Sequence, residues 1–175
     1  MRNKVSSVLI FTMLGLLSCG EEQHMEPMEP VYFKMTMMNE RGLETTVFEK
    51  GEEVIMALSI VNHSGNEFKV AGPSVECFMV GKEDFMYVYK RSIGVNGILL
   101  DLPVGRPYQD QKVCPLMLWY KKIPVGETSL VSVPWSNNPS NEPLEAGLYY
   151  SAFPVTLEIG GKTQTWQLRK EFRVR

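Results

Sequence analysis

The sequence is poor in the residues that most often carry catalysis or bind metals. It has two histidines, His24 and His63, and three cysteines in 175 residues. His24 lies in a segment rich in acids and prolines, and His63 lies in a turn motif between two predicted strands. A Ser-His-Asp or Cys-His mechanism needs a histidine held in fixed geometry, and neither position provides one. Metal-ligand spacing and a phosphate-binding Gly-x-x-x-x-Gly-Lys loop are also absent from the sequence. We therefore predict a protein that is not an enzyme and has no metal site and no cofactor.

An excess of positive charge is also lacking. The chain has 18 Lys and Arg against 20 Asp and Glu, a formal net charge of −2. Loss of a leader containing Arg2 and Lys4 leaves 18 − 2 = 16 basic residues, and the net charge becomes −4. Because nucleic-acid binding needs a basic surface, we expect no nucleic-acid partner.

An apolar run long enough to cross a bilayer is missing as well. After the basic residues Arg2 and Lys4, residues 5–17 are mostly apolar. A spanning helix needs roughly 20 apolar residues, whereas a secretory signal needs a shorter run of about 7 to 15. The segment ends in LLSC, residues 16–19. It therefore has the length of a signal peptide that ends at a cysteine.

The LLSC ending resembles the lipobox of bacterial lipoproteins, in which a leucine stands three residues before the cysteine and a small residue directly precedes it. The resemblance implies a signal peptide over 1–18, lipidation of Cys19, and an acidic tether over 19–30. Glu21 and Glu22 resemble the surface-export signal of Bacteroidetes-type lipoproteins; the alternative is that they only keep the tether solvated. We expect an extracytoplasmic protein, lipid-anchored to the outer membrane of a Gram-negative bacterium, with exposure at the cell surface left open.

The remainder, residues 31–175, has the size of one domain and the pattern of an all-β fold. Prolines and glycines separate short β-rich runs, which is typical of a sandwich or barrel. Residues 31–38 alternate between apolar and mixed faces, as a half-buried strand does, and residues 53–62 are apolar on both faces, as in a central strand. Further strands are predicted at 44–48, 67–70, 75–80, 85–90, 116–121, 128–134, 147–156 and 163–174. Gly160-Gly161 is predicted as a hairpin turn, and residues 92–113 as a long irregular loop.

Several motifs of this domain occur in the order found in the intracellular proteinase inhibitor family. They are Gly126-Glu127, then Trp135, then Leu144, Gly147 and Tyr149 in a Leu-x-x-Gly-x-Tyr pattern entering a late strand. The chain resembles that family, which implies an Ig-like β-sandwich of two antiparallel sheets. It also implies a protease inhibitor acting through a surface loop as one alternative function.

Cys77 and Cys114 are the two cysteines left once Cys19 is assigned to the anchor. In an exported protein they can form a disulfide. Closing a loop of about 37 residues would stabilise the fold by roughly 3 to 4 kcal/mol. Two buried free thiols are the alternative, because cysteine is among the most buried residue types. The sequence leaves both open.

The polar, Pro-rich loops 92–113 and 135–143 are the predicted contact surface, since sandwiches commonly bind through loops. The candidate binding residues in them are Asn96, Arg106, Tyr108, Trp135, Asn137 and Asn138. We predict a lipid-anchored module that binds a protein or glycan partner. The alternatives are protease inhibition, glycan capture on outward-facing aromatic rings, and a structural role in a surface complex.

Overall fold

The computed structural model describes residues 30–72, 84–108, 119–159 and 162–175. In chain order the described elements are β1 (Val31–Met38), β2 (Val47–Phe48), β3 (Ile55–Asn62), β4 (Phe68–Gly72), β5 (Val88–Ile93), η1 (Val95–Gly97), β6 (Leu99–Gly105), β7 (Trp119–Ile123), β8 (Gly126–Pro134), η2 (Trp135–Asn137), β9 (Gly147–Ile159) and β10 (Lys162–Val174). The predicted signal peptide, the tether up to residue 29, Cys19, Cys77, Cys114, the strand at 75–80 and Gly160-Gly161 lie outside the described residues.

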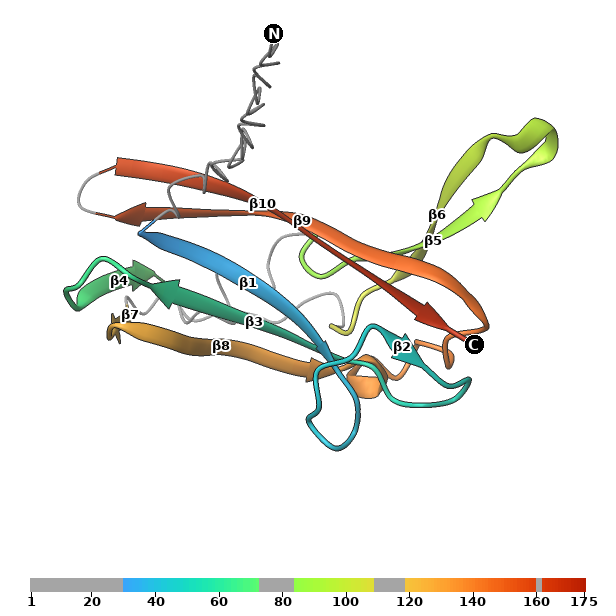
Figure 1. Cartoon of the computed structure of the whole chain (residues 1–175), viewed down its shortest axis with the longest axis horizontal. Helices are drawn as coiled ribbons and strands as arrows, with labels where there is room; N and C mark the ends of the chain where they lie inside the picture. Colours follow the sequence, from blue (N-terminus) through green and yellow to red (C-terminus); the bar gives the residue numbers. More distant parts are fainter. Residues whose placement is uncertain (1–29, 73–83, 109–118, 160–161) are drawn as a thin grey trace, which may run out of the picture.

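Two larger sheets face each other as the layers of a sandwich (Figure 1). One has the strand order β1-β3-β8, and the other has the order β2-β10-β9-β5-β6. β4 and β7 form a separate two-stranded antiparallel sheet. The all-β sandwich expected from the sequence is therefore confirmed, with a small third sheet in addition.

The apolar pattern of the first layer explains its strand order. Val31, Phe33, Met35 and Met37 alternate along β1 and are all buried, as the sequence pattern predicts. β3 is buried along nearly its whole length because β1 and β8 pair with its two edges. The prediction of a central strand over residues 53–62 is thus confirmed.

Aromatic side chains join the two layers across the core. The ring of Phe33 on β1 meets that of Trp166 on β10 edge to face, with centroids 5.1 Å apart. A second pair lies within the second layer, where Phe85, just before β5, and Phe153 on β9 lie 4.9 Å apart in a similar arrangement. Such pairs add about 0.5–1.5 kcal/mol each to the free energy gained by burying their surface. The Phe33–Trp166 contact therefore ties the two layers together, and the Phe85–Phe153 contact stabilises the second layer.

The second layer is built on a long hairpin of β9 and β10, which pair from Ile159 opposite Lys162 to Gly147 opposite Val174. The expectation of antiparallel sheets is wrong at one edge, where β2 pairs parallel with β10. Two backbone bonds beside β10 hold that edge: Arg173 N–H donates to the Thr46 carbonyl at 2.8 Å, and Arg175 N–H donates to the Phe48 carbonyl at 3.0 Å.

The structure corrects the prediction of an irregular loop over residues 92–113 as far as Gly105, and residues 109–113 lie outside the described part of the chain. β5 and β6 form an antiparallel hairpin there, closed by a bond from Gly94 N–H to the Ile98 carbonyl at 2.8 Å. Asn96 and Gly97 both have φ of 75°, the left-handed geometry that an Asn-Gly pair adopts in a tight turn. Pro103 is tolerated because β6 is an edge strand.

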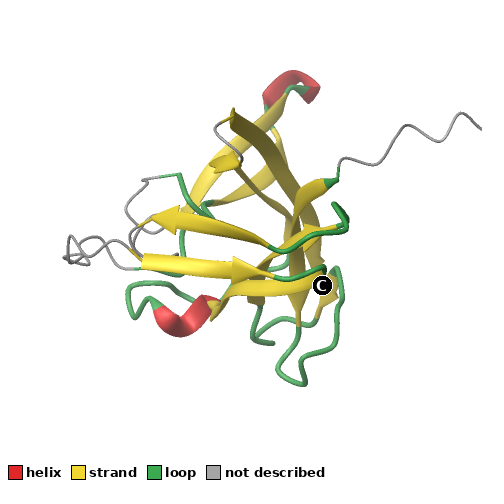
Figure 2. Cartoon of the chain, turned by 90° about the vertical axis from the view of Figure 1, so that its left-hand side faces the viewer, coloured by secondary structure: helices red, strands yellow, loops and turns green. Residues whose placement is uncertain are grey.

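The strand predicted at residues 85–90 also begins later than expected. Residues 84–86 form a turn in which Met86 has a positive φ of 53°, and the strand starts at Val88. From there the β5–β6 hairpin projects beyond the two layers (Figure 1), and its tip is the uppermost helical turn in Figure 2.

Candidate functional site

The two predicted binding loops meet at one end of the sandwich, beside the foot of the β5–β6 hairpin. Asn137 Nδ2 donates to the Pro107 carbonyl at 2.8 Å. Asn138 Nδ2 donates to the carbonyls of Arg106 at 3.1 Å and Tyr108 at 3.3 Å. The structure therefore brings five of the six candidate residues together. Asn96 is apart from them, at the hairpin tip.

Two of the candidate residues are buried rather than exposed to a partner. Trp135 is 5% exposed, and its indole Nε1 donates to the Glu142 carbonyl at 2.8 Å. Tyr108 is 6% exposed and packs on Phe85 with ring centroids 5.8 Å apart. These side chains anchor the loops, and the contact surface must come from their neighbours.

Asn141, which the sequence analysis did not single out, completes the junction. Its Nδ2 donates to the carbonyl of Arg106 at 2.9 Å and to that of Trp135 at 3.0 Å. Gly105, at the end of β6, comes so close that a Cβ there would lie 3.0 Å from Asn141 Oδ1. The run WSNNPSN at residues 135–141 could have predicted this role, because asparagine side chains often form hydrogen bonds with the backbone of their own loop.

A cavity of about 400 Å³ lies between the end of β6 and this loop. Its lining comes from β5, β6 and β9 of the second layer and from the segment before β9: Lys90, Val104, Trp135, Ser140, Asn141, Glu142, Pro143, Leu144, Glu145 and Tyr149. The volume lies in the range of small-ligand or peptide side-chain sites. The lining combines aliphatic and aromatic surface with charged groups of both signs.

Charged groups surround Tyr149 in this cavity. The Tyr149 hydroxyl donates to the Glu145 carbonyl at 2.7 Å, and burial raises the pKa of Tyr149. A hydrogen bond from Lys50, 2.8 Å from the Glu145 carboxylate, holds the pKa of Glu145 below its usual value. Lys90 Nζ lies 5.6 Å from the centre of the Tyr149 ring. Among the described residues no carboxylate lies within ion-pair distance of Lys90, and its charge acts at longer range on Glu145, where it adds to the lowering of the pKa by Lys50.

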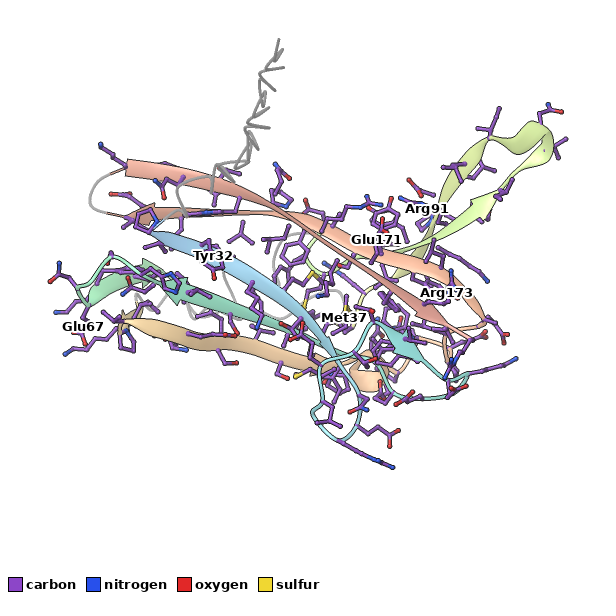
Figure 3. The ribbon with its side chains drawn as sticks, viewed as in Figure 1. Tyr32, Met37, Glu67, Arg91, Glu171 and Arg173 are labelled. Carbon is purple, nitrogen blue, oxygen red and sulfur yellow. The ribbon has the colours of Figure 1, made fainter. Side chains whose placement is uncertain are left out.

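A second cluster lies on the outer face of the same sheet. The rings of Tyr89 and Tyr150 stack with centroids 5.2 Å apart, and the Arg169 guanidinium lies 3.8 Å from the centre of the Tyr150 ring. Arg169 and Arg91 both pair with Glu171, at 2.9 and 3.2 Å; Arg91 and Glu171 are labelled in Figure 3. Arg169 covers the Tyr150 ring, so this ring offers no open face for a sugar.

The hairpin itself is the most apolar exposed feature of the described chain. Seven aliphatic side chains on it are between 41% and 88% exposed: Ile93, Val95, Ile98, Leu99, Leu100, Leu102 and Val104. A contiguous apolar patch of this kind marks an interaction surface in soluble proteins. The prediction of a loop over residues 92–113 did not indicate this surface, because the Asn96-Gly97 pair closes a hairpin turn there.

Metal-ligating side chains do not cluster in the described part of the chain. There, no three His, Cys, Asp or Glu side chains are placed to hold a metal ion. His63 is an exposed turn residue whose ring contacts Tyr32 edge to face at 5.8 Å. Within the same residues, no helix has the length and apolar character to cross a membrane.

Comparison with known proteins does not identify a family for this chain. No protein-family model matches the chain, and no curated protein matches it. Two solved structures of a beta-glucosidase from Listeria innocua resemble it, one in complex with gluconolactone and one a D270A mutant in complex with laminaribiose. Each is 12% identical with a TM-score of 0.27; the matches cover 82% and 83% of this chain and 16% of the enzyme. A likeness this weak carries no functional argument.

Proposed function

We propose that this chain is a lipid-anchored, extracytoplasmic binding module of a Gram-negative outer membrane that acts without catalysis. Residues 1–18 are the signal peptide, Cys19 is the lipidated residue, and 19–30 form the tether. The LLSC ending of the apolar run supports the anchor. Two or more acyl chains hold a protein stably on a membrane, whereas one chain anchors only marginally. The mass of the N-terminal peptide of the membrane-extracted protein tests this part.

The cavity beside β6 is the observation that carries the binding role. Its loop wall is held by the amides of Asn137, Asn138 and Asn141, so little ordering is needed when a ligand enters. Val104 and Leu144 offer aliphatic surface, and Lys90 offers a cation. This combination suits a protein segment that places an apolar side chain next to an acidic one.

Site-specific cross-linking tests the partner site. A photoreactive amino acid replaces Val104 in the full chain, within cells of the source organism, and cross-linked products are identified by mass spectrometry. We expect one dominant protein product that weakens when Lys90→Ala is added. The same photoreactive residue at Val125, a 57% exposed position on the β7–β8 turn, is the matched control. Equal products from both positions, or no effect of Lys90→Ala, would contradict the proposal.

Protease inhibition is the second candidate, and the rigidity of the loop at 135–142 favours it. Inhibitor loops bind tightly when they are held in the bound conformation beforehand. Asn138 provides such support from within the loop, since its Oδ1 also accepts the Ser140 N–H at 3.1 Å. A panel of serine proteases assayed with the full chain separates the two functions. No inhibition at micromolar protein would end this alternative.

A further inference from the structure

The end of the β5–β6 hairpin is apolar all the way round. We call residues 92–100 the hairpin cap; Ser92 and Asn96 are its only side chains with a polar group, and it has no charge. Ile93 lies opposite Leu99 on one face, while Leu100 lies on the other face opposite Ser92. Val95 and Ile98 are 88% and 61% exposed at the turn. A flat protein surface would cover only one of these sides, so the cap suits an environment that surrounds it.

Charges begin at a defined distance from the tip. The first charged pair is Arg91 opposite Asp101, with Arg91 Nε 3.6 Å from the carboxylate, and Lys90 follows it. Asp101 is three residues from Ile98, which at about 3.3 Å per residue is roughly 10 Å. Interfacial elements bury their apolar side roughly 5–10 Å into the boundary between lipid headgroups and acyl chains. At that depth Lys90 and Arg91 would lie level with the phosphates.

The free edge of β6 is a poor template for a partner strand. Among the described strands β6 pairs only with β5, and Pro103 has no N–H to donate to a further strand. Shallow insertion into lipid needs no such strand, because the edge groups stay within reach of water and headgroups. The side chains of the cap, and not its edge, therefore carry the recognition.

We propose that the hairpin cap inserts into the headgroup and upper acyl region of a lipid bilayer. A tether from Cys19 to Pro30 spans at most about 40 Å when fully extended, which holds the domain next to the membrane that anchors it. The anchor and the cap together then fix the orientation of the domain, with the cavity beside β6 just above the headgroups. The insertion of the cap is inferred from the geometry of the hairpin alone, so it does not depend on lipidation of Cys19.

Depth-dependent quenching tests this insertion. The full chain, as wild type or with Val95→Trp, is reconstituted into vesicles of phosphatidylethanolamine and phosphatidylglycerol, with or without bromine on the acyl chains. The emission of the added tryptophan is obtained by subtracting the wild-type spectrum, which cancels the emission of the three native tryptophans. We expect a blue-shifted emission that is lost in the brominated vesicles. Val125→Trp, at the β7–β8 turn and also exposed, is expected to show neither change.

The outcomes separate lipid from protein contacts. Equal quenching at Val95 and Val125, or none at either, would overturn the proposal. A blue shift of the Val95→Trp signal without bromine quenching would place the cap against protein and would also overturn it. Ile98→Trp repeats the measurement from the other side of the turn, and unchanged thermal unfolding verifies that each variant is folded. The mass of the Cys19 peptide is read separately, so a failure of the lipid anchor is not mistaken for a failure of the cap.

Discussion

At the scale of single residues, asparagine side chains hold turns of this protein in place, and Asn62 is the clearest case. Asn62 is fully buried at the end of β3. Its Nδ2 donates to the carbonyls of Asn66 at 2.8 Å, Pro124 at 3.1 Å and Ile123 at 3.2 Å, and its Oδ1 accepts the Ser64 N–H at 3.0 Å. One side chain thus connects the β3–β4 turn to the β7–β8 turn.

Replacing Asn62 with Ala should destabilise the whole fold. The change removes the Asn62 donor from one buried bond, to the Ile123 carbonyl, and from two part-buried bonds, to the carbonyls of Asn66 and Pro124. A buried polar group left unsatisfied costs about 1–3 kcal/mol. We expect a clear drop in the urea midpoint of unfolding. Asn66→Ala is the control, because only the backbone carbonyl of Asn66 takes part in this network. Equal midpoints for the two variants would contradict the role given to the Asn62 side chain.

Asn141 should stabilise a local region instead. Asn141→Ala removes one bond from the loop at 135–142 to the Arg106 carbonyl, just after β6, and one bond within the loop to the Trp135 carbonyl. A hydrogen bond of this kind contributes about 1 kcal/mol. We expect faster hydrogen exchange at residues 105–107 and 136–142, with exchange in β9 unchanged. Unaltered exchange in the loop would show that Asn138 and Asn137 suffice to hold it.

At the scale of elements, the sequence predicts the strands whose burial is regular and fails where a strand is exposed. β1, β3, β9 and β10 bury alternate or continuous apolar faces, so residue pattern alone locates them. β6 carries the run LLDLPVG, in which aliphatic side chains remain exposed. Its pattern fits no buried face, and its proline suggests a loop. The strand exists because β5 pairs with it and an Asn-Gly turn closes the hairpin.

The candidate site was predictable in position but not in its contacts. The composition of the two loops placed the site at 92–113 and 135–143, and of the first loop the segment 106–108 does meet the second. The polar and aromatic residues that suggest binding, such as Trp135 and Asn138, instead make intramolecular bonds. Lys90 and Val104 line the cavity because β5 and β6 pair beside the loop, and this requires the three-dimensional register.

The β5–β6 hairpin should depend on its turn glycine. Gly97 has open space around it but a φ of 75°, so Gly97→Ala adds backbone strain without a clash. The left-handed geometry costs a non-glycine residue roughly 1–2 kcal/mol. We expect faster exchange of the amides in β6 and little change in global unfolding, because the cap lies outside the core. A large fall in global stability would show that the hairpin is part of the cooperative core.

At the scale of the whole molecule, surface ion pairs should make stability depend on pH. A hydrogen bond from Arg169 lowers the pKa of Glu171 below 4.5, and one from Lys50 lowers that of Glu145. A carboxyl with a lowered folded pKa stabilises the fold above its unfolded pKa, and this contribution is lost as pH falls through the folded pKa. We expect the thermal midpoint to fall below about pH 4.5 at low ionic strength, since salt screens exposed charges.

Glu171→Gln should make that fall smaller, because the glutamine cannot titrate. Glu158→Gln, at an exposed position on β9, is the matched control and should leave the pH dependence as in the wild type. An identical pH profile for Glu171→Gln and the wild type would show that the Arg169–Glu171 pair contributes nothing to folding.

One end of the described molecule brings together the hairpin cap, the cavity beside β6 and the loop at 135–142, and this is the end that we propose for contact. Hydroxyl-radical footprinting of the full chain in its native cell envelope, compared with the same chain purified in detergent, tests this most directly. We predict that Val95, Ile98, Leu99 and Val104 are shielded in the envelope, while Leu43 and Val125, which are similarly exposed in the structure, are labelled equally in both. Equal labelling of all six positions, or shielding of Leu43 and Val125 alone, would contradict the account.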